Sequence, residues 1–95
     1  MKSVATTFGS HKTVHSSLKK PIEELGEIPG VDRVILGPSK GTRHHRPVGS
    51  LKIQSDVPTG IRMVGYSDRG ISEFYVITSE IESVRAEIVK RFSIS

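Results

Sequence analysis

The sequence contains no cysteine and no tryptophan, and only five of its 95 residues are aromatic. Without cysteine the chain has no disulfide, no thiolate ligand for zinc and no thiol nucleophile, which excludes a disulfide-framed secreted domain. No window approaches the roughly 18–20 apolar residues of a membrane span, and residues 1–10 lack the apolar core of a signal peptide. We therefore expect a cytoplasmic protein that does not cross a membrane.

The length and the composition fit one folded domain. With 35% hydrophobic and 25% charged residues, the chain can form a single modest core. A protein of this size buries only about 60–68% of the surface of its unfolded chain, which leaves no room for a second core. The polar stretch over residues 1–12 is expected to be flexible, and residues 13–95 are expected to form the domain.

Positive charge is concentrated in two segments. The chain has 14 Lys and Arg against 10 Asp and Glu, a net charge of +4. Residues 1–22 and 33–55 contain no acidic residue, and their bases are Lys2, Lys12, Lys19, Lys20, Arg33, Lys40, Arg43, Arg46 and Lys52. If the two segments meet on one face, that face attracts an anionic partner. The competing interpretation is a set of separate, solvated side chains.

Two helices are predicted, one near each end of the domain. The first begins at Ser16 or Ser17, has Pro21 in its first turn, and ends at Pro29-Gly30. Its apolar residues recur at the spacing of one helical face: Leu18, Ile22, Leu25 and Ile28. The second helix follows a capping box over residues 79–82, and its apolar stripe is Ile81, Val84, Ile88 and Phe92.

Between the helices, short apolar segments alternate with turn residues. Residues 31–36, 50–54, 61–66 and 71–78 fit strands, with tight turns at 57–60 and 67–70, and the last strand is expected to be central. Residues 37–47, with two glycines and two prolines, are expected to form an exposed loop. The order α-β-β-β-β-α predicts an α+β fold, a two-layer sandwich with a mostly antiparallel sheet and both helices on one face.

The loop over residues 38–47 carries the donor groups that phosphate oxygens accept. Ammonium, hydroxyl, guanidinium and imidazole groups come from Lys40, Thr42, Arg43, His44, His45 and Arg46. The residue order of a Walker motif is absent, so nucleotide hydrolysis of that type is not predicted. We predict a small non-enzymatic binding module without a cofactor, which holds a phosphate-bearing partner, RNA or DNA, through this loop. Helping cations would be Arg33, Lys52, Lys12, Lys19 and Lys20.

Proteins that bind nucleic acids also use aromatic side chains, on which the bases stack. The candidates are Tyr66 and Tyr75, and each can serve only if it points to the open face of the sheet rather than into the core. The sequence leaves the direction of both side chains open.

The four histidines form two pairs and support an alternative, the binding of zinc or another divalent transition metal. His11 and His15 are four residues apart, which places them on one face if they are helical, and His44 and His45 are adjacent. The glutamate of a zincin motif is missing after His11, so metalloprotease chemistry is not predicted. The competing interpretation is that the histidines are solvated or contact phosphate.

Two further functions use the same residues. A metal-independent ribonuclease would take its acid and base from His15, His44 or His45, and its cations from Lys40, Arg43 and Arg46. A protein-interaction module would dock an acidic protein on a strand edge or on the basic face.

Several short motifs together resemble a small family of uncharacterised prokaryotic proteins described as predicted metal-binding. The motifs are His15-Ser16, Pro29-Gly30-Val31, the basic loop with its histidines, Leu51 to Ile53, and the strand from Glu73 to Thr78. The resemblance covers about His15 to Ile88. It implies that His15 and one or both of His44 and His45 are metal ligands, and it implies no reaction.

Overall fold

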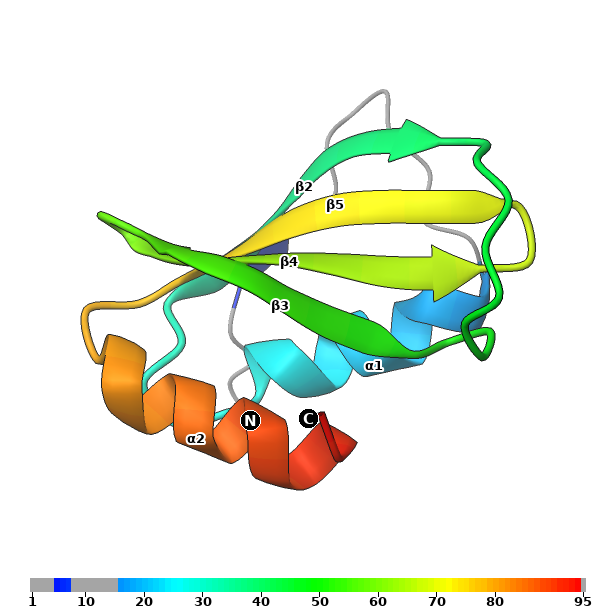
Figure 1. Ribbon diagram of the computed structural model, residues 1–95. Helices are drawn as coiled ribbons and strands as arrows, with labels where there is room; N and C mark the ends of the chain where they lie inside the picture. The colour runs from blue at the N-terminus through cyan, green and yellow to red at the C-terminus, as the bar shows by residue number, and fades with distance from the viewer. Residues whose placement is uncertain (1–4, 8–15, 95) are drawn as a thin grey trace.

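The chain folds into a five-stranded sheet with two helices. The computed structural model describes residues 5–7 and 16–94. In chain order the elements are β1 (Ala5–Thr7), α1 (Ser16–Gly26), β2 (Arg33–Lys40), β3 (Leu51–Val57), β4 (Gly60–Ser67), β5 (Gly70–Ile77) and α2 (Ile81–Phe92). The strand order is β1-β2-β5-β4-β3, in which β1 pairs with β2 in parallel and all other pairs are antiparallel. Both helices lie on the same face of the sheet (Figure 1).

The predicted architecture is confirmed. The order α-β-β-β-β-α, the antiparallel sheet of β2 to β5 and the two-layer α+β sandwich are all present, and β5 is the central strand. β1 is an addition, because it lies in the N-terminal stretch for which no element was predicted. Neither helix is long and apolar enough to cross a membrane, within the part of the chain that the structure describes.

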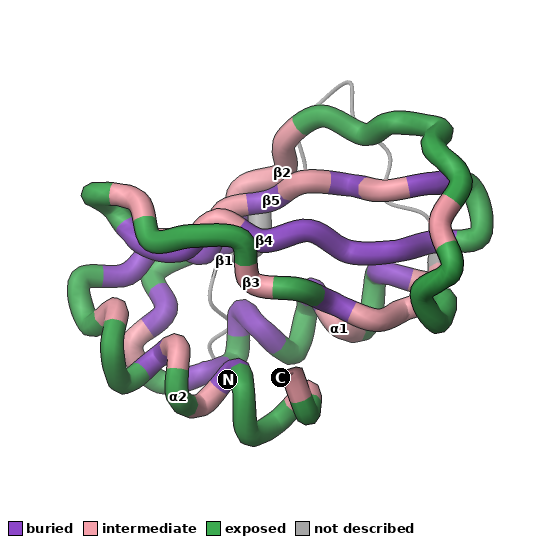
Figure 2. The backbone as a smooth tube through the Cα atoms, in the orientation of Figure 1, coloured by how far each residue is buried: buried purple, intermediate pink, exposed green. Residues whose placement is uncertain are grey.

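The core lies between the sheet and the helices. Successive residues of β5 alternate between buried and half-buried, as expected for a strand with one face on the core, and the buried set includes Phe74 and Val76. β4 is buried along almost its whole length (Figure 2). The cluster formed by the sheet and the helices consists of Leu18, Ile22, Leu25, Ile28, Val31, Val34, Leu51, Ile61, Met63, Phe74, Val76, Val84 and Ile88.

The predicted end of the first strand is wrong. β2 continues through Gly37 and Pro38 to Lys40, so the loop that follows begins at Gly41 rather than at residue 37. Proline has no N–H for a ladder, and Pro38 is accommodated because the register with β5 shifts between Leu36 and Ser39. The basic loop is therefore shorter than expected and starts from a fixed strand end.

Two predictions about the first helix are also wrong. α1 ends at Gly26, and Ile28 joins the core from a tighter turn in which the Ile28 N–H donates to the Leu25 carbonyl. Pro21 is the sixth residue of α1 and so lies beyond the first turn. There its ring removes the N–H that would bond to the carbonyl of Ser17.

The capping box predicted for the second helix does not form. The N-cap of α2 is Glu80, and no side chain caps it. Thr78 organises this junction instead: its hydroxyl donates to the Gly30 carbonyl at 2.5 Å and accepts from the Glu80 N–H at 2.9 Å. Thr78 is 2% exposed. One buried hydroxyl therefore ties the entry of α2 to the turn before β2.

Replacing Thr78 by valine is expected to lower the free energy of unfolding by about 1–2 kcal/mol, since the Gly30 carbonyl and the Glu80 N–H both lose their partner. Chemical denaturation measures the change. Ser79→Ala is the matched control, because Ser79 is exposed and would cost as much only if it capped the helix. A larger loss for Ser79→Ala than for Thr78→Val would contradict this assignment.

Candidate functional site

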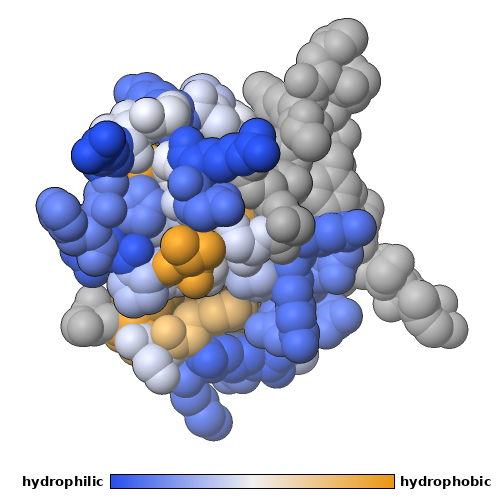
Figure 3. Space-filling model, turned by 90° about the vertical axis from the view of Figure 1, so that its right-hand side faces the viewer, coloured by the Kyte–Doolittle hydropathy of each residue, from blue (hydrophilic) through white to orange (hydrophobic). Residues whose placement is uncertain are grey.

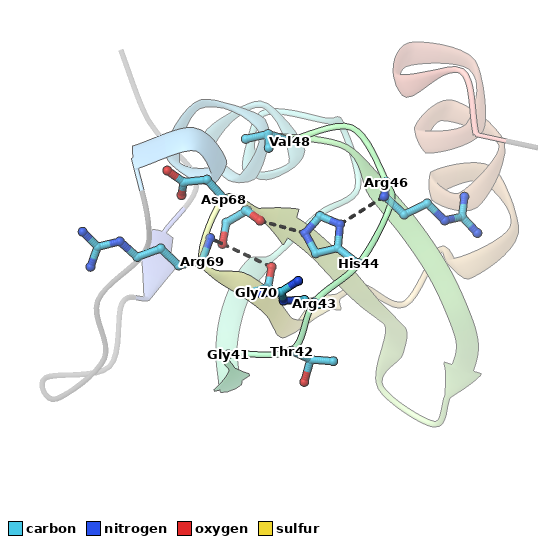
Figure 4. A pocket seen from close by; sticks show the side chains of 10 residues that line it. Gly41, Thr42, Arg43, His44, Arg46, Val48, Asp68, Arg69 and Gly70 are labelled. Carbon is cyan, nitrogen blue, oxygen red and sulfur yellow. Dashed lines mark hydrogen bonds between the residues drawn. The ribbon is translucent and has the colours of Figure 1, made fainter.

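The basic loop and the β4–β5 turn enclose a cleft at one end of the sheet (Figure 4). Its volume is about 450 Å³, and it is open to solvent. The loop and the turn are far apart in sequence, and the antiparallel pairing of β2, β5 and β4 brings them together. The lining residues are Gly41, Thr42, Arg43, His44, Arg46, Val48, Ser67, Asp68, Arg69 and Gly70.

His44 fastens the loop to the turn. Its Nδ1 accepts a hydrogen bond from the Arg46 N–H at 3.1 Å, and its Nε2 lies 2.7 Å from the Ser67 carbonyl oxygen. A carbonyl only accepts, so Nε2 carries the proton and donates it, while Nδ1 is unprotonated. Both ring nitrogens of this neutral tautomer are therefore engaged within the protein.

The ring of Tyr66 packs against the basic loop. Its ring centroid lies 4.9 Å from that of His44, and the guanidinium carbon of Arg46 is 5.7 Å from the centroid of Tyr66. Its backbone also holds the loop, through bonds with Gly49 at 2.6 Å and with Ser50 at 2.9 Å. Tyr66 is 8% exposed. The ring of Tyr66 is therefore covered by the basic loop, and little of it is exposed to a ligand.

The β4–β5 turn is fixed by the side chain of Ser67. The Ser67 hydroxyl accepts from the Arg69 N–H at 3.1 Å and donates to the Gly70 carbonyl at 3.2 Å, and the residue is buried. Asp68 and Arg69 project from this turn and are exposed. Ser67 and Arg69 were missing from the residues predicted for the site, because only the pairing of β2 with β5 shows that this turn meets the loop.

The cleft is predominantly cationic. Arg43, Arg46 and Arg69 line it, and Asp68 is its one acidic residue. Arg46 and Arg69 extend to opposite sides of the cleft (Figure 4). The surface at this end of the molecule is largely hydrophilic around a small hydrophobic area (Figure 3). The ion pairs found among residues 5–7 and 16–94 are Arg62–Glu73, Arg85–Asp56 and Arg91–Glu87, so none of them neutralises a cleft arginine.

The structure brings together part of the predicted set. Thr42, Arg43, His44 and Arg46 line the cleft, and Lys40 directly precedes Gly41 at the end of β2. His45 is exposed and does not line the cleft. A second, smaller hollow of about 290 Å³ adjoins the cleft through Arg46, and its lining contains Lys52.

The remaining predicted residues lie elsewhere. Arg33 is at the opposite end of β2 from Lys40, about 23 Å away along an extended strand. Lys19 and Lys20 are exposed on α1 and do not line the cleft. His11, Lys12 and His15 lie outside the described residues. Among the described residues, the cations of the two basic segments therefore do not form one compact set.

The described residues give little support to the metal-binding hypothesis. They contain no group of three or more His, Asp or Glu side chains that could hold a metal ion. His44 could coordinate a metal only by giving up one of its two hydrogen bonds. Because His11 and His15 fall outside the described residues, a histidine metal site stays a prediction.

Comparisons with known proteins give no match, whether with models of protein families, with curated proteins or with solved structures. The resemblance to a family of predicted metal-binding proteins also stays a prediction. Any functional inference therefore depends on the structure itself.

Proposed function

We propose that the chain is a non-enzymatic binding module that holds nucleic acid through phosphate contacts at the cleft. The observation that carries this proposal is the gathering of Arg43, Arg46 and Arg69 around one cleft, from two segments that His44 joins. Guanidinium groups donate two parallel hydrogen bonds to phosphate oxygens, which makes arginine the preferred residue for this contact.

The arrangement of the cations favours a polyanion over a single small anion. The cleft is open, and two of its arginines extend to opposite sides instead of converging on one point (Figure 4). Arg46 lines both hollows, so the cations continue from Arg69 through Arg46 to Lys52. A row of separated positive charges matches the repeated phosphates of a nucleic acid backbone.

Binding is better supported than cleavage. The metal-independent ribonuclease predicted from the histidines needs an imidazole nitrogen that is free to take a proton from the 2′-hydroxyl group. Both nitrogens of His44 are engaged with backbone groups. His45 does not line the cleft, and His15 lies outside the described residues. The arginines can hold phosphate without either imidazole reacting.

The salt dependence of binding tests the proposal. Arg43→Ala/Arg46→Ala is expected to weaken the binding of a fluorescent oligonucleotide about tenfold or more, and to reduce the slope of log K against log salt by about 1–2. Fluorescence anisotropy at several salt concentrations measures both. The matched control is Lys19→Ala/Lys20→Ala, which removes the same charge from α1, outside the cleft.

If the two double variants lose affinity equally, net charge and not the cleft determines binding. Binding that does not change with salt, or that survives Arg43→Ala/Arg46→Ala unchanged, would equally refute the phosphate contacts at this site.

A further inference from the structure

The second face of the sheet carries no described helix. On β5 and β4 the residues that alternate with the core point to this face, and the cross-strand register extends it to β2 and β3. Its apolar and aromatic members are half-buried or buried without belonging to the core cluster. The face contains Arg33, Ile35, Lys40, Lys52, Arg62, Val64, Tyr66, Ile71, Glu73, Tyr75 and Ile77.

Tyr75 lies at the centre of this face. It pairs with Ile35 of β2 on one side and with Arg62 of β4 on the other. A Cβ added at Gly37 would lie 3.4 Å from Cε1 of Tyr75, so the ring extends across β2 at a residue without a side chain. Tyr75 is half-buried, unlike Tyr66, which His44 covers. Tyr75 is thus the tyrosine of this face that the basic loop leaves accessible.

The charges around Tyr75 complement a nucleic acid backbone. Glu73 is the one acidic residue among the positions named for this face, and it accepts a hydrogen bond from Arg62 at 3.1 Å. The same face carries three exposed cations, Arg33, Lys40 and Lys52. An aromatic ring within a basic sheet surface is the combination on which single-stranded bases stack.

We infer that the partner is a single strand, which runs from the cleft onto this face and stacks a base on Tyr75. The inference depends on the function proposed above and specifies its substrate. Along β5, Tyr75 lies four residues from Ile71, the partner of Tyr66, a distance of about 13 Å. A short oligonucleotide can therefore contact the cleft and Tyr75 together. A duplex cannot stack a base on Tyr75, because its bases are stacked and paired inside the helix.

The tyrosine fluorescence of the protein reports this stacking directly. The chain has two tyrosines and no tryptophan, so Tyr66→Phe makes Tyr75 the sole tyrosine emitter while keeping the ring that contacts His44. A single-stranded oligonucleotide is expected to quench this emission. A strand of the same length with abasic residues is the matched control, and it is expected to bind the cleft without quenching.

The affinity of Tyr75 variants gives the second readout. Tyr75→Leu is expected to weaken binding of the single strand roughly 5- to 100-fold, while Tyr75→Phe keeps the wild-type affinity because it keeps the ring. Binding of the abasic strand should be the same for all three proteins, which also shows that Tyr75→Leu is folded. Duplex of the same sequence is expected to bind more weakly than the single strand.

The outcomes separate this inference from the proposed function. One outcome is salt-dependent binding of the single strand that needs Arg43 and Arg46 but neither quenches Tyr75 nor weakens in Tyr75→Leu. In that case the strand does not use the sheet face, and the function proposed for the cleft is retained. Equal affinity for duplex and single strand overturns the inference in the same way. If no strand binds at low salt, the proposed function and this inference both fail.

Discussion

Replacing Gly70 by alanine is expected to lower the free energy of unfolding by about 3 kcal/mol and to disrupt the cleft. Gly70 has a φ of 138°, in the region that side chains other than glycine rarely adopt. A Cβ at this position would overlap the carbonyl oxygen of Lys40 and would lie 2.8 Å from the Cα of Gly41. Relief of this overlap requires the end of β2 and the β4–β5 turn to separate, and the two walls of the cleft would move apart.

Gly41 gives a matched control for this prediction. It lines the same cleft, but a Cβ added there meets nothing closer than the Arg69 carbonyl oxygen at 3.7 Å, an ordinary van der Waals distance. Gly41→Ala is therefore expected to change stability by less than about 0.5 kcal/mol. Urea denaturation of both variants, followed by oligonucleotide titration of the folded proteins, measures the two effects. Equal tolerance of alanine at both positions would show that the close approach at Gly70 is not a constraint.

The four antiparallel strands and their order along the chain were predictable because local signals agree with one another. The segment that holds Phe74 and Val76 is apolar, β-branched and bounded by turn residues, and it forms the central strand. The ends of elements were less predictable, because tertiary contacts decide them. Thr78, Ser79 and Glu80 all carry polar side chains that suit a helix start, and the Gly30 carbonyl, 48 residues away, selects Thr78 for the junction.

Four of the ten residues that line the cleft were predicted from sequence. Arg43, His44 and Arg46 stand within four consecutive residues, so their proximity needs no knowledge of the fold. Arg69 could not be assigned, because its place beside them depends on the pairing of β2 with β5, which sets Lys40 opposite Ile71. Arg33 shows the opposite error: it is seven residues from Lys40, but an extended strand turns that separation into about 23 Å.

The imidazole of His44 can either anchor the basic loop or coordinate a metal ion. In the structure it is an anchor, since its two nitrogens bond to the backbone of Arg46 and of Ser67. His44→Ala removes both bonds and the ring over Tyr66, so we expect a loss of about 2 kcal/mol in stability. We also expect about tenfold weaker oligonucleotide binding, because ordering the loop then opposes binding. Hydrogen exchange at the Arg46 amide should accelerate, since this N–H loses its acceptor.

Two conservative variants of His44 separate the contributions of its nitrogens. An asparagine side chain can accept from the backbone N–H two residues ahead, so His44→Asn is expected to keep the Arg46 amide protected while losing the bond to Ser67. His44→Gln has the reach to donate to the Ser67 carbonyl and is expected to keep more of the affinity than alanine does. If His44→Ala changes neither amide exchange nor affinity, other contacts hold the loop. The imidazole of His44 would then be available as a metal ligand, as the metal-binding hypothesis requires.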